Sequence, residues 1–311
     1  VQARVESQVD DSVRARRAEL ARRRAAVVAA RDLPGAVALA TLFVWLLSPA
    51  APGRAAEEIV WTGERSIYYS GLQDAAHEFT RLTQIKVTAI PGGCGAASAG
   101  VKQGKVDVGG LCCAIKEEEL SKFGFKHYPM GIEGLAIVVH PSNPVKSLTQ
   151  QQVRDILTGK ITNWKEVGEK ERPIKVVARP HCTDREGNWK QIVPDKKLLA
   201  KGRIDVKEDQ DVLLAVKDNE NSIGFIGLNM VNPRFARPIA IDGVVPGRQS
   251  LIDGTYPWKI QNSLILASNS SAAAKKFVDF ILGDGRKLLH KDLVFLDEVK
   301  VAPAKKTGKG R

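Results

Sequence analysis

Three of the four cysteines of this chain lie in one stretch, Pro91 to Ile115. A glycine-rich turn over residues 92–95 contains Cys94 and leads into a helix of small residues. A short strand then ends at the adjacent Cys112 and Cys113. Glycines let backbone N–H groups approach a ligand closely, and a helix that begins there adds a positive dipole end. The pattern is that of an anion-binding cradle, and it contains three of the four cysteines.

The fourth cysteine, Cys182, lies in a second polar turn that spans residues 179–185. Cysteine is a weak hydrogen-bond donor, so a cradle built from it should bind phosphate poorly. Thiolates instead select Cu(I), zinc, iron–sulfur clusters or thiophilic metalloids, and nearby cations favour the thiolate form. No cofactor is certain, but a thiolate-bound metal ion or metal cofactor is expected. Its candidate ligands are Cys94, Cys112, Cys113, Cys182 and His181. Because adjacent side chains on an extended chain point in opposite directions, one of Cys112 and Cys113 should face the ligand.

The elements that would position these turns alternate between strands and helices. Glu58–Thr62 reads as a strand, Ile67–Thr83 as a helix capped by Ser66, and Ile85–Ile90 as a second strand. This order is typical of a parallel α/β sheet. Gly131–His140 is a strongly apolar strand, expected at the centre. Further strands are predicted over 106–110, 174–178, 222–226, 238–241 and 262–267, and helices over 149–158, 188–193, 209–217, 272–282 and 285–290.

Six segments together resemble the periplasmic phosphate-binding proteins of ABC importers. They occur in order and lie within residues 57–299: 134–145, 159–180, 222–228, 239–246, 254–258 and 275–289. The resemblance implies a two-lobed periplasmic-binding-protein fold of α/β class, with a mostly parallel sheet flanked by helices in each lobe and a ligand cleft between the lobes. Lobe 1 would comprise residues 57–140 and 229–299, and lobe 2 residues 141–228. It also implies an ABC permease or a sensor in the membrane as partner.

The resemblance further implies three turns that hold a small oxyanion, and here their hydroxyl donors are largely replaced by cysteines. The ligand-binding residues it indicates are Gly63, Arg65, Ser66, Gly93, Cys94, Gly95, Cys112, Cys113, His181, Cys182, Thr183 and Arg185. Arg65, Arg179 and Arg185 would pair either an anion or a neighbouring carboxylate such as Glu64, Asp184 or Glu186. The ligand is therefore expected to be a small oxyanion or a soft metal or metalloid.

Composition and the chain ends limit the other readings. The chain has 311 residues, 43% hydrophobic and 26% charged, as in a soluble globular protein. Its net charge of +12 is concentrated at the two ends, which disfavours nucleic-acid binding. Residues 1–56 are expected to be an extension with a signal peptide or anchor, because Ala36–Leu47 has the length of a signal-peptide core. A buried core segment is the alternative. The protein should be periplasmic or extracytoplasmic and monomeric, with a basic, disordered tail over 300–311.

Two alternatives to a thiolate site stay open. In an exported chain, four cysteines are also compatible with disulfides, for example Cys94 with Cys112 or Cys113, in an ordinary phosphate receptor. A thiol redox protein is the second alternative, although the chain has no C-x-x-C motif. No nucleophile elbow, metal-hydrolase helix or catalytic dyad is present, so no enzyme activity is expected.

Overall fold

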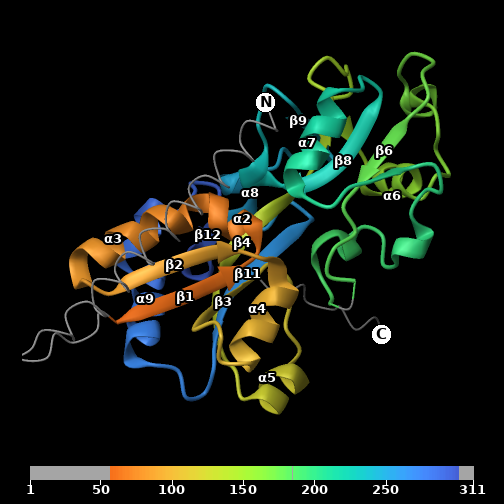
Figure 1. Cartoon of the computed structure of the whole chain (residues 1–311). Coiled ribbons are helices and arrows are strands. Elements are labelled where there is room, and N and C mark those ends of the chain that lie inside the picture. The colour runs from red at the N-terminus through yellow and green to blue at the C-terminus, as the bar shows by residue number, and fades with distance from the viewer. Residues whose placement is uncertain (1–56, 184, 301–311) are drawn as a thin grey trace, which may run out of the picture. The chain divides into compact units, whose positions relative to one another are not determined.

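The computed structural model describes residues 57–183 and 185–300, all of which fall within one compact unit, Gly53–Arg311. The predicted extension with its signal peptide or anchor (1–56), Asp184, and the tail beyond Lys300 lie outside the described residues. A ten-stranded sheet organises the described chain, with its main strands in the order β2-β1-β3-β11-β4-β8-β6-β7 (Figure 1). These strands are β1 (Glu58–Gly63), β2 (Lys86–Pro91), β3 (Val108–Leu111), β4 (Lys126–Val139), β6 (Lys175–Ala178), β7 (Ile204–Asp205), β8 (Ser222–Gly227) and β11 (Lys259–Leu266).

The long strand β4 connects two parts of this sheet. Its residues Lys126–Gly134 pair antiparallel with β11, whereas Leu135–Val139 pair antiparallel with β8. We call the part with β2, β1, β3 and β11 the first lobe, and the part with β8, β6 and β7 the second lobe. Pairs β1/β2, β1/β3, β6/β7 and β6/β8 are parallel. The two-lobed α/β fold predicted from the sequence is thus confirmed, while the predicted lobe boundaries stay a prediction.

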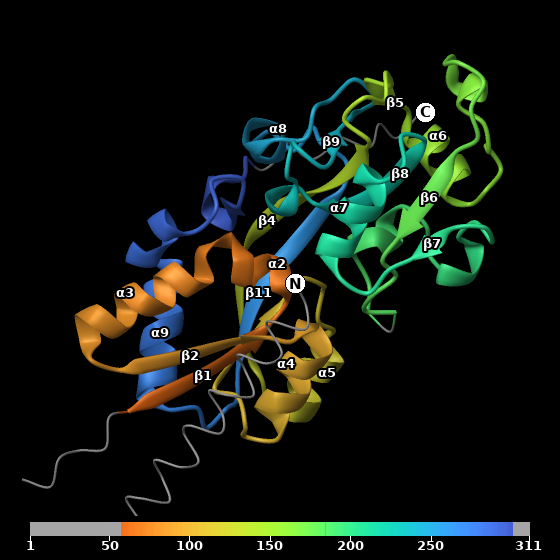
Figure 2. The ribbon, with the colours of Figure 1, turned by 45° about the horizontal axis from the view of Figure 1, so that its top comes forward.

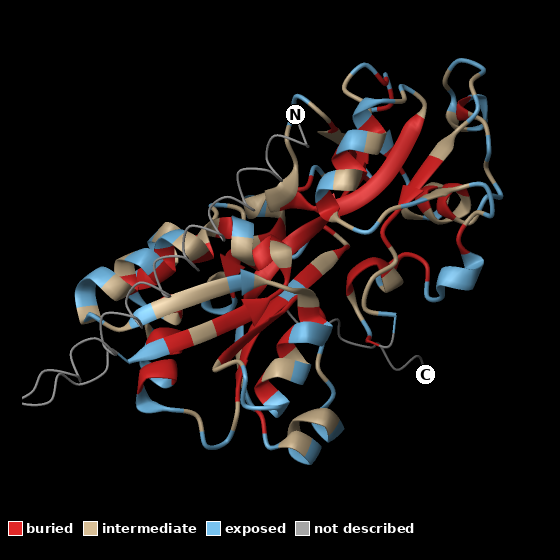
Figure 3. Cartoon of the chain, viewed as in Figure 1, coloured by how far each residue is buried: buried red, intermediate tan, exposed pale blue. Residues whose placement is uncertain are grey.

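Helices cover both faces of the first lobe's sheet (Figure 2). The side chains of β11 alternate: Leu264 and Leu266 belong to the core beneath α3 (Gln73–Thr83) and α9 (Ala272–Leu282). Ile265 belongs to the core on the α4 (Gly93–Lys102) side. This alternation is the two-residue period of a strand buried on both faces, and Figure 3 shows the strands of the sheet as largely buried.

The second lobe repeats this arrangement on the other half of β4. Ala136 and Val138 pack with α7 (Asp209–Lys217), and Ile137 and Val139 pack on the side of α6 (Gln150–Leu157). Thr149 caps α6, because its hydroxyl accepts the Gln152 N–H while the Gln152 side chain accepts the Thr149 N–H. The helix predicted over 209–217 is confirmed with the same bounds.

The helix predicted over 67–83 starts two residues earlier in the structure, so its predicted start is wrong. It begins at Arg65 with Glu64 at the N-cap, not Ser66, and it consists of α2 (Arg65–Ile67), η1 (Tyr68–Leu72) and α3. The path is interrupted at Gly71, where φ is +103°. A Cβ there would lie 2.1 Å from the carbonyl oxygen of Leu288, so a side chain at this position would clash with the C-terminal segment.

The remaining elements are short. Two helices predicted over 188–193 and 285–290 are 3-10 turns, η3 (Asn188–Gln191) and η6 (Asp284–Leu288). The others are α5 (Glu117–Phe123), β5 (Ser147–Leu148), η2 (Trp164–Val167), η4 (Lys196–Leu198), η5 (Leu228–Met230), β9 (Arg237–Pro238), β10 (Ala240–Ile241), α8 (Arg248–Ile252), β12 (Val294–Phe295) and η7 (Leu296–Glu298). Within residues 57–183 and 185–300, no helix combines the length and apolar character needed to cross a bilayer.

Candidate functional site

The four cysteines meet at one place between the lobes, which we call the cysteine cluster. Cys94 lies in the first turn of α4, Cys112 and Cys113 follow β3, and Cys182 follows β6 in the second lobe. Their four Sγ atoms all lie within 4.8 Å of one another. The Cys94 and Cys112 sulfurs are 3.4 Å apart, and those of Cys112 and Cys113 are 3.6 Å apart. All four are free thiols, and only Cys182 is not fully buried.

The sequence predicts that one of Cys112 and Cys113 faces the ligand, whereas the structure places both sulfurs in the cluster. Both sulfurs belong to the cluster, because the two residues form a bend after β3 ends at Leu111 and are not extended. The alternation of side chains applies only while the chain remains a strand. Cys182 likewise lies in a turn, with φ of +48°.

Glycines bring the two ligand turns of the first lobe together. Strands β1 and β3 are parallel neighbours, with Gly63 opposite Gly110. A Cβ on Gly63 would lie 2.6 Å from the Gly110 Cα, so only glycine permits this approach. The Glu64 N–H then donates to the Gly110 carbonyl at 3.1 Å, and the Cys112 N–H donates to Cys94 Sγ at 3.2 Å. Glu64 is thereby placed beside the cysteine cluster.

His181 borders the cluster from the second lobe. Its Nδ1 lies 3.0 Å from the Arg179 carbonyl oxygen, and its Nε2 lies 3.8 Å from Cys112 Sγ. The Asn188 side-chain N–H donates to the same Nε2 at 3.1 Å. Glu64, Cys112 and His181 offer one donor atom each within 4.8 Å of one another.

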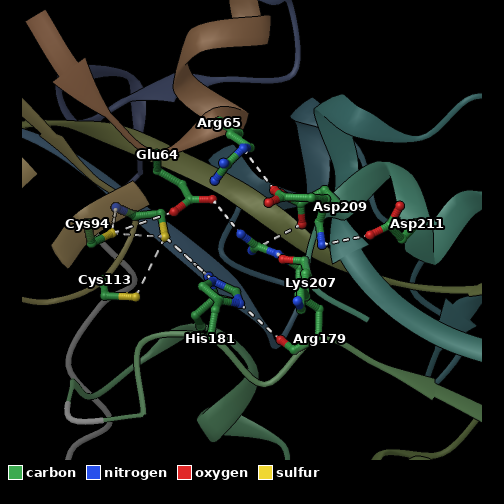
Figure 4. A network of polar contacts seen from close by, with 12 residues as sticks. Glu64, Arg65, Cys94, Cys113, Arg179, His181, Lys207, Asp209 and Asp211 are labelled. Atoms are coloured by element: carbon green, nitrogen blue, oxygen red, sulfur yellow. Dashed lines mark hydrogen bonds and ion pairs between the residues drawn. The ribbon is translucent and has the colours of Figure 1, made fainter. Parts of the chain in front are cut away.

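A buried guanidinium lies next to these donors. Arg179 pairs with Glu64 at 3.2 Å across the lobes and with Asp209 at 3.4 Å (Figure 4). Burial lowers the pKa of Arg179, but Asp209 and Glu64 outweigh it and the net shift is upward. Burial raises the pKa of Asp209, against the opposing effect of Arg179. A cavity of about 10 Å³ remains between these groups, lined also by Ser66, Cys112 and His181.

The thiols of the cluster differ in acidity. Contacts with Cys112, Cys113 and Cys94 lower the pKa of Cys182, which is the most exposed of the four. Contacts with Cys113, Cys182 and Cys94, together with complete burial, raise the pKa of Cys112. The pKa of Cys94 is lowered as well, chiefly by its contact with Cys112.

The other residues predicted for the site lie around this centre, at different distances from it. Ser66 is buried, and its Oγ has no partner among the described residues. Gly93 has φ of +80° and faces Glu64. Gly95 and Thr183 line a wider cavity of about 430 Å³ that reaches Cys182.

The arginines pair with carboxylates. Arg179 pairs with Glu64 as predicted. Arg65 pairs with Glu208 at 2.8 Å, and Arg185 contacts Glu119 at 2.6 Å. Glu186 instead pairs with Lys116 at 3.6 Å, and Asp184 lies outside the described residues.

Sequence reasoning missed Asp209 and Asn188, and it treated Glu64 only as a partner for an arginine. Asp209 was placed at the start of a predicted helix, and Asn188 at the start of another, without any signal that these ends meet the ligand turns. The contact of Asn188 with Cys112 joins the two lobes. Asp209 meets Arg179 within the second lobe, between two segments that are 30 residues apart in the chain.

Comparison with known proteins assigns the family. A model of the PBP superfamily domain matches residues 48–285. The chain belongs to the PBP superfamily. It is 28% identical over 194 residues to the phosphate-binding protein PstS of Bacillus subtilis, covering 61% of this chain and 63% of that protein. It is 27% identical over 289 residues to protein SphX of Synechococcus elongatus, covering 86% of this chain and 83% of SphX.

Solved structures agree with this assignment. A phosphate ABC transporter substrate-binding protein from Clostridium perfringens, solved with bound phosphate, superposes with a TM-score of 0.70 at 25% identity and covers 77% of this chain and 100% of that chain. An ABC-type phosphate transport receptor from Vibrio cholerae gives 0.61 at 23% identity, with 75% and 96% covered. The resemblance predicted from the sequence is confirmed.

Proposed function

We propose that this chain is an exported solute-binding protein that captures a thiophilic metal ion, or a small species that contains one, between its lobes. Cys94, Cys112, Cys113 and Cys182 supply the ligand atoms. The observation that carries the proposal is the convergence of four free thiols from both lobes within 4.8 Å. The proposal includes an extracytoplasmic location, a monomeric protein, and an ABC permease or sensor as the membrane partner.

The spacing of the sulfurs supports a metal ligand set. Zinc–sulfur bonds of ~2.3 Å in a tetrahedron separate the sulfurs by roughly 3.8 Å. The two shortest sulfur separations here, 3.4 and 3.6 Å, come close to that value. Soft thiolates also suit Cu(I) and thiophilic metalloids, so the donor type selects a class of ion and not one element.

Charge around the cluster supports the thiolate form. Burial lowers the pKa of Arg185, but Glu119 and the negative charges of Cys94 and Cys182 raise it by more. The same attraction favours ionised sulfur at those two cysteines. Because Cys182 belongs to the second lobe and the other three belong to the first, a bound ion would hold the lobes together, which is the closure that a membrane partner would recognise.

Phosphate is the second candidate ligand. The names of the relatives and the unpartnered hydroxyl of Ser66 favour it. The carboxylates weigh against it, because Glu64 and Asp209 line the same small cavity and already occupy Arg179. An oxyanion with two negative charges would be repelled by them, and a cation would be attracted.

Titration of the purified protein separates these functions. The protein is reduced and freed of metal under anaerobic conditions, then titrated with Zn(II), with Cu(I) and with inorganic phosphate by calorimetry. We expect tight metal binding, and Cys182→Ser should weaken it at least about tenfold. Ser66→Ala is the matched control, since it removes a hydroxyl at the cavity and no sulfur ligand.

Three results would contradict the proposal. Tight phosphate binding that Ser66→Ala abolishes, with no metal bound, would return the function to that of a phosphate receptor. Disulfides at all four cysteines in the exported protein, found by free-thiol titration, would exclude a thiolate site. A disulfide that is reduced and re-formed in turnover with a thiol partner would favour the redox alternative.

A further inference from the structure

A second set of metal donors shares one sulfur with the cysteine cluster. Glu64, Cys112 and His181 bring a carboxylate oxygen, Sγ and a ring nitrogen within 4.8 Å of one another. Cys112 is a member of both sets, and it is the sulfur nearest to His181. A thiolate in this position can bind an ion on either side.

The hydrogen bond at Nδ1 of His181 determines which ring nitrogen can serve as a metal ligand. A carbonyl oxygen only accepts hydrogen bonds, so the 3.0 Å contact between Nδ1 and the Arg179 oxygen requires the proton on Nδ1. In the neutral ring Nε2 then carries a lone pair, which accepts from the Asn188 side-chain N–H at 3.1 Å and lies 3.8 Å from Cys112 Sγ. A backbone carbonyl that holds the other ring nitrogen is the usual outer-shell partner of a metal-bound histidine.

Two side-chain oxygens, from Glu64 and Asn188, lie near Cys112 and His181. Glu64 uses Oε1 for Arg179, which leaves Oε2 facing Cys94 Sγ at 3.9 Å. Asn188 is 95% buried, and its Oδ1 has no partner among the described residues while its Nδ2 contacts Nε2 of His181. Rotation of the amide by half a turn exchanges these two atoms and places a carbonyl oxygen beside Nε2. The small cavity lined by Glu64, Cys112, His181 and Asn188 lies at this point.

We propose that Glu64, Cys112 and His181 form a second metal site and that Cys112 bridges two divalent ions, one in each donor set. The proposal rests on the proposed function, since the first ion is the one held by the four cysteines. Charge favours two ions. Metal binding displaces the thiol protons, and the four thiolates and Glu64 then carry five negative charges. One divalent ion leaves an excess of three, and a second reduces it to one beside the Arg179 guanidinium.

Native mass spectrometry of the full-length, reduced protein loaded with Zn(II) counts the bound ions directly. We expect two zinc ions per chain in the unmodified protein and one in His181→Ala and in Glu64→Gln. Glu64→Gln keeps the shape of the side chain and protects the test if His181→Ala fails to fold. His77→Ala is the matched control, because His77 is exposed on α3, and it should retain two ions.

Each outcome separates this inference from the proposed function. One ion in the unmodified protein, lost in Cys113→Ser, would overturn the second site and leave the cysteine cluster as a metal site. No ion in any form would overturn both. Two ions that persist in both His181→Ala and Glu64→Gln would show that the second ion binds elsewhere and would overturn the assignment.

Discussion

Glu133 is buried at the point where β4 passes from one lobe to the other, and replacing it should alter how stability depends on pH. Burial raises the pKa of Glu133 from 4.5 to about 8, although a hydrogen bond from Asn262 opposes the shift and the charge of Asp209 adds to it. Its Oε2 and the neighbouring Oδ1 atoms of Asn229 and Asn262 have no partner among the described residues. The protonated carboxyl is therefore the form that suits this environment, because it adds a donor among acceptors.

The sign and size of the effect follow from this pKa. A carboxyl whose pKa is raised on folding contributes fully to stability below the unfolded value of 4.5. That contribution is lost as the pH rises through 8. At about 1.4 kcal/mol for each pKa unit, the loss between those limits approaches ~5 kcal/mol as an upper bound. Glu133→Gln carries no charge and supplies the donor at every pH, so it should escape the loss.

Urea unfolding of the unmodified protein and Glu133→Gln at pH 5, 7 and 9 measures the effect. The free energy of unfolding of the variant, relative to the unmodified protein, should rise with pH by several kcal/mol. Taking this difference cancels the titration of cysteines and histidines, which both forms share. Glu118→Gln is the matched control, because Glu118 is exposed on α5 and should show no such trend. A difference that is constant from pH 5 to 9 would refute the reasoning.

Three further substitutions test other parts of the structure by the same unfolding assay. Arg179→Met should destabilise the protein by about 3–5 kcal/mol at pH 7, because it leaves two buried carboxylates unpaired. The loss should shrink as the pH is lowered and the carboxylates become protonated. An equal loss at all pH values would contradict this. Gly71→Ala should lower the free energy of unfolding by more than about 1 kcal/mol, because φ is +103° and the new Cβ would meet the Leu288 oxygen. Gly104→Ala is the control: a Cβ at Gly104 would have no atom within 4 Å, so this variant tests the effect of positive φ alone. Thr149→Ala should cost about 0.5–2 kcal/mol by removing the cap of α6, and an unchanged stability would mean that the capping box is not needed.

Patterns local in the chain predicted much of the fold. The apolar period and charge of residues 209–217 and 272–282 predict two helices with the bounds that the structure has. Their amphipathic faces and capping residues are encoded within about a dozen positions, so no distant contact is needed to find them. The path from Glu64 to Gln73 was mispredicted. It is interrupted at Gly71, which packs closely against Leu288, more than two hundred residues along the chain.

In the candidate site, too, some features follow from the sequence and others only from the tertiary structure. Cysteine at the ligand turns, and the chemistry of sulfur, are properties of the sequence by itself, as is membership of a two-lobed binding-protein family. Which groups surround those sulfurs was decided only in three dimensions. The pairing of Arg179 with Glu64 joins positions 115 residues apart, and the contact of His181 with Cys112 joins positions 69 apart. The order of strands in the sheet and the packing of one lobe against the other create these contacts, and no local pattern in the chain specifies them.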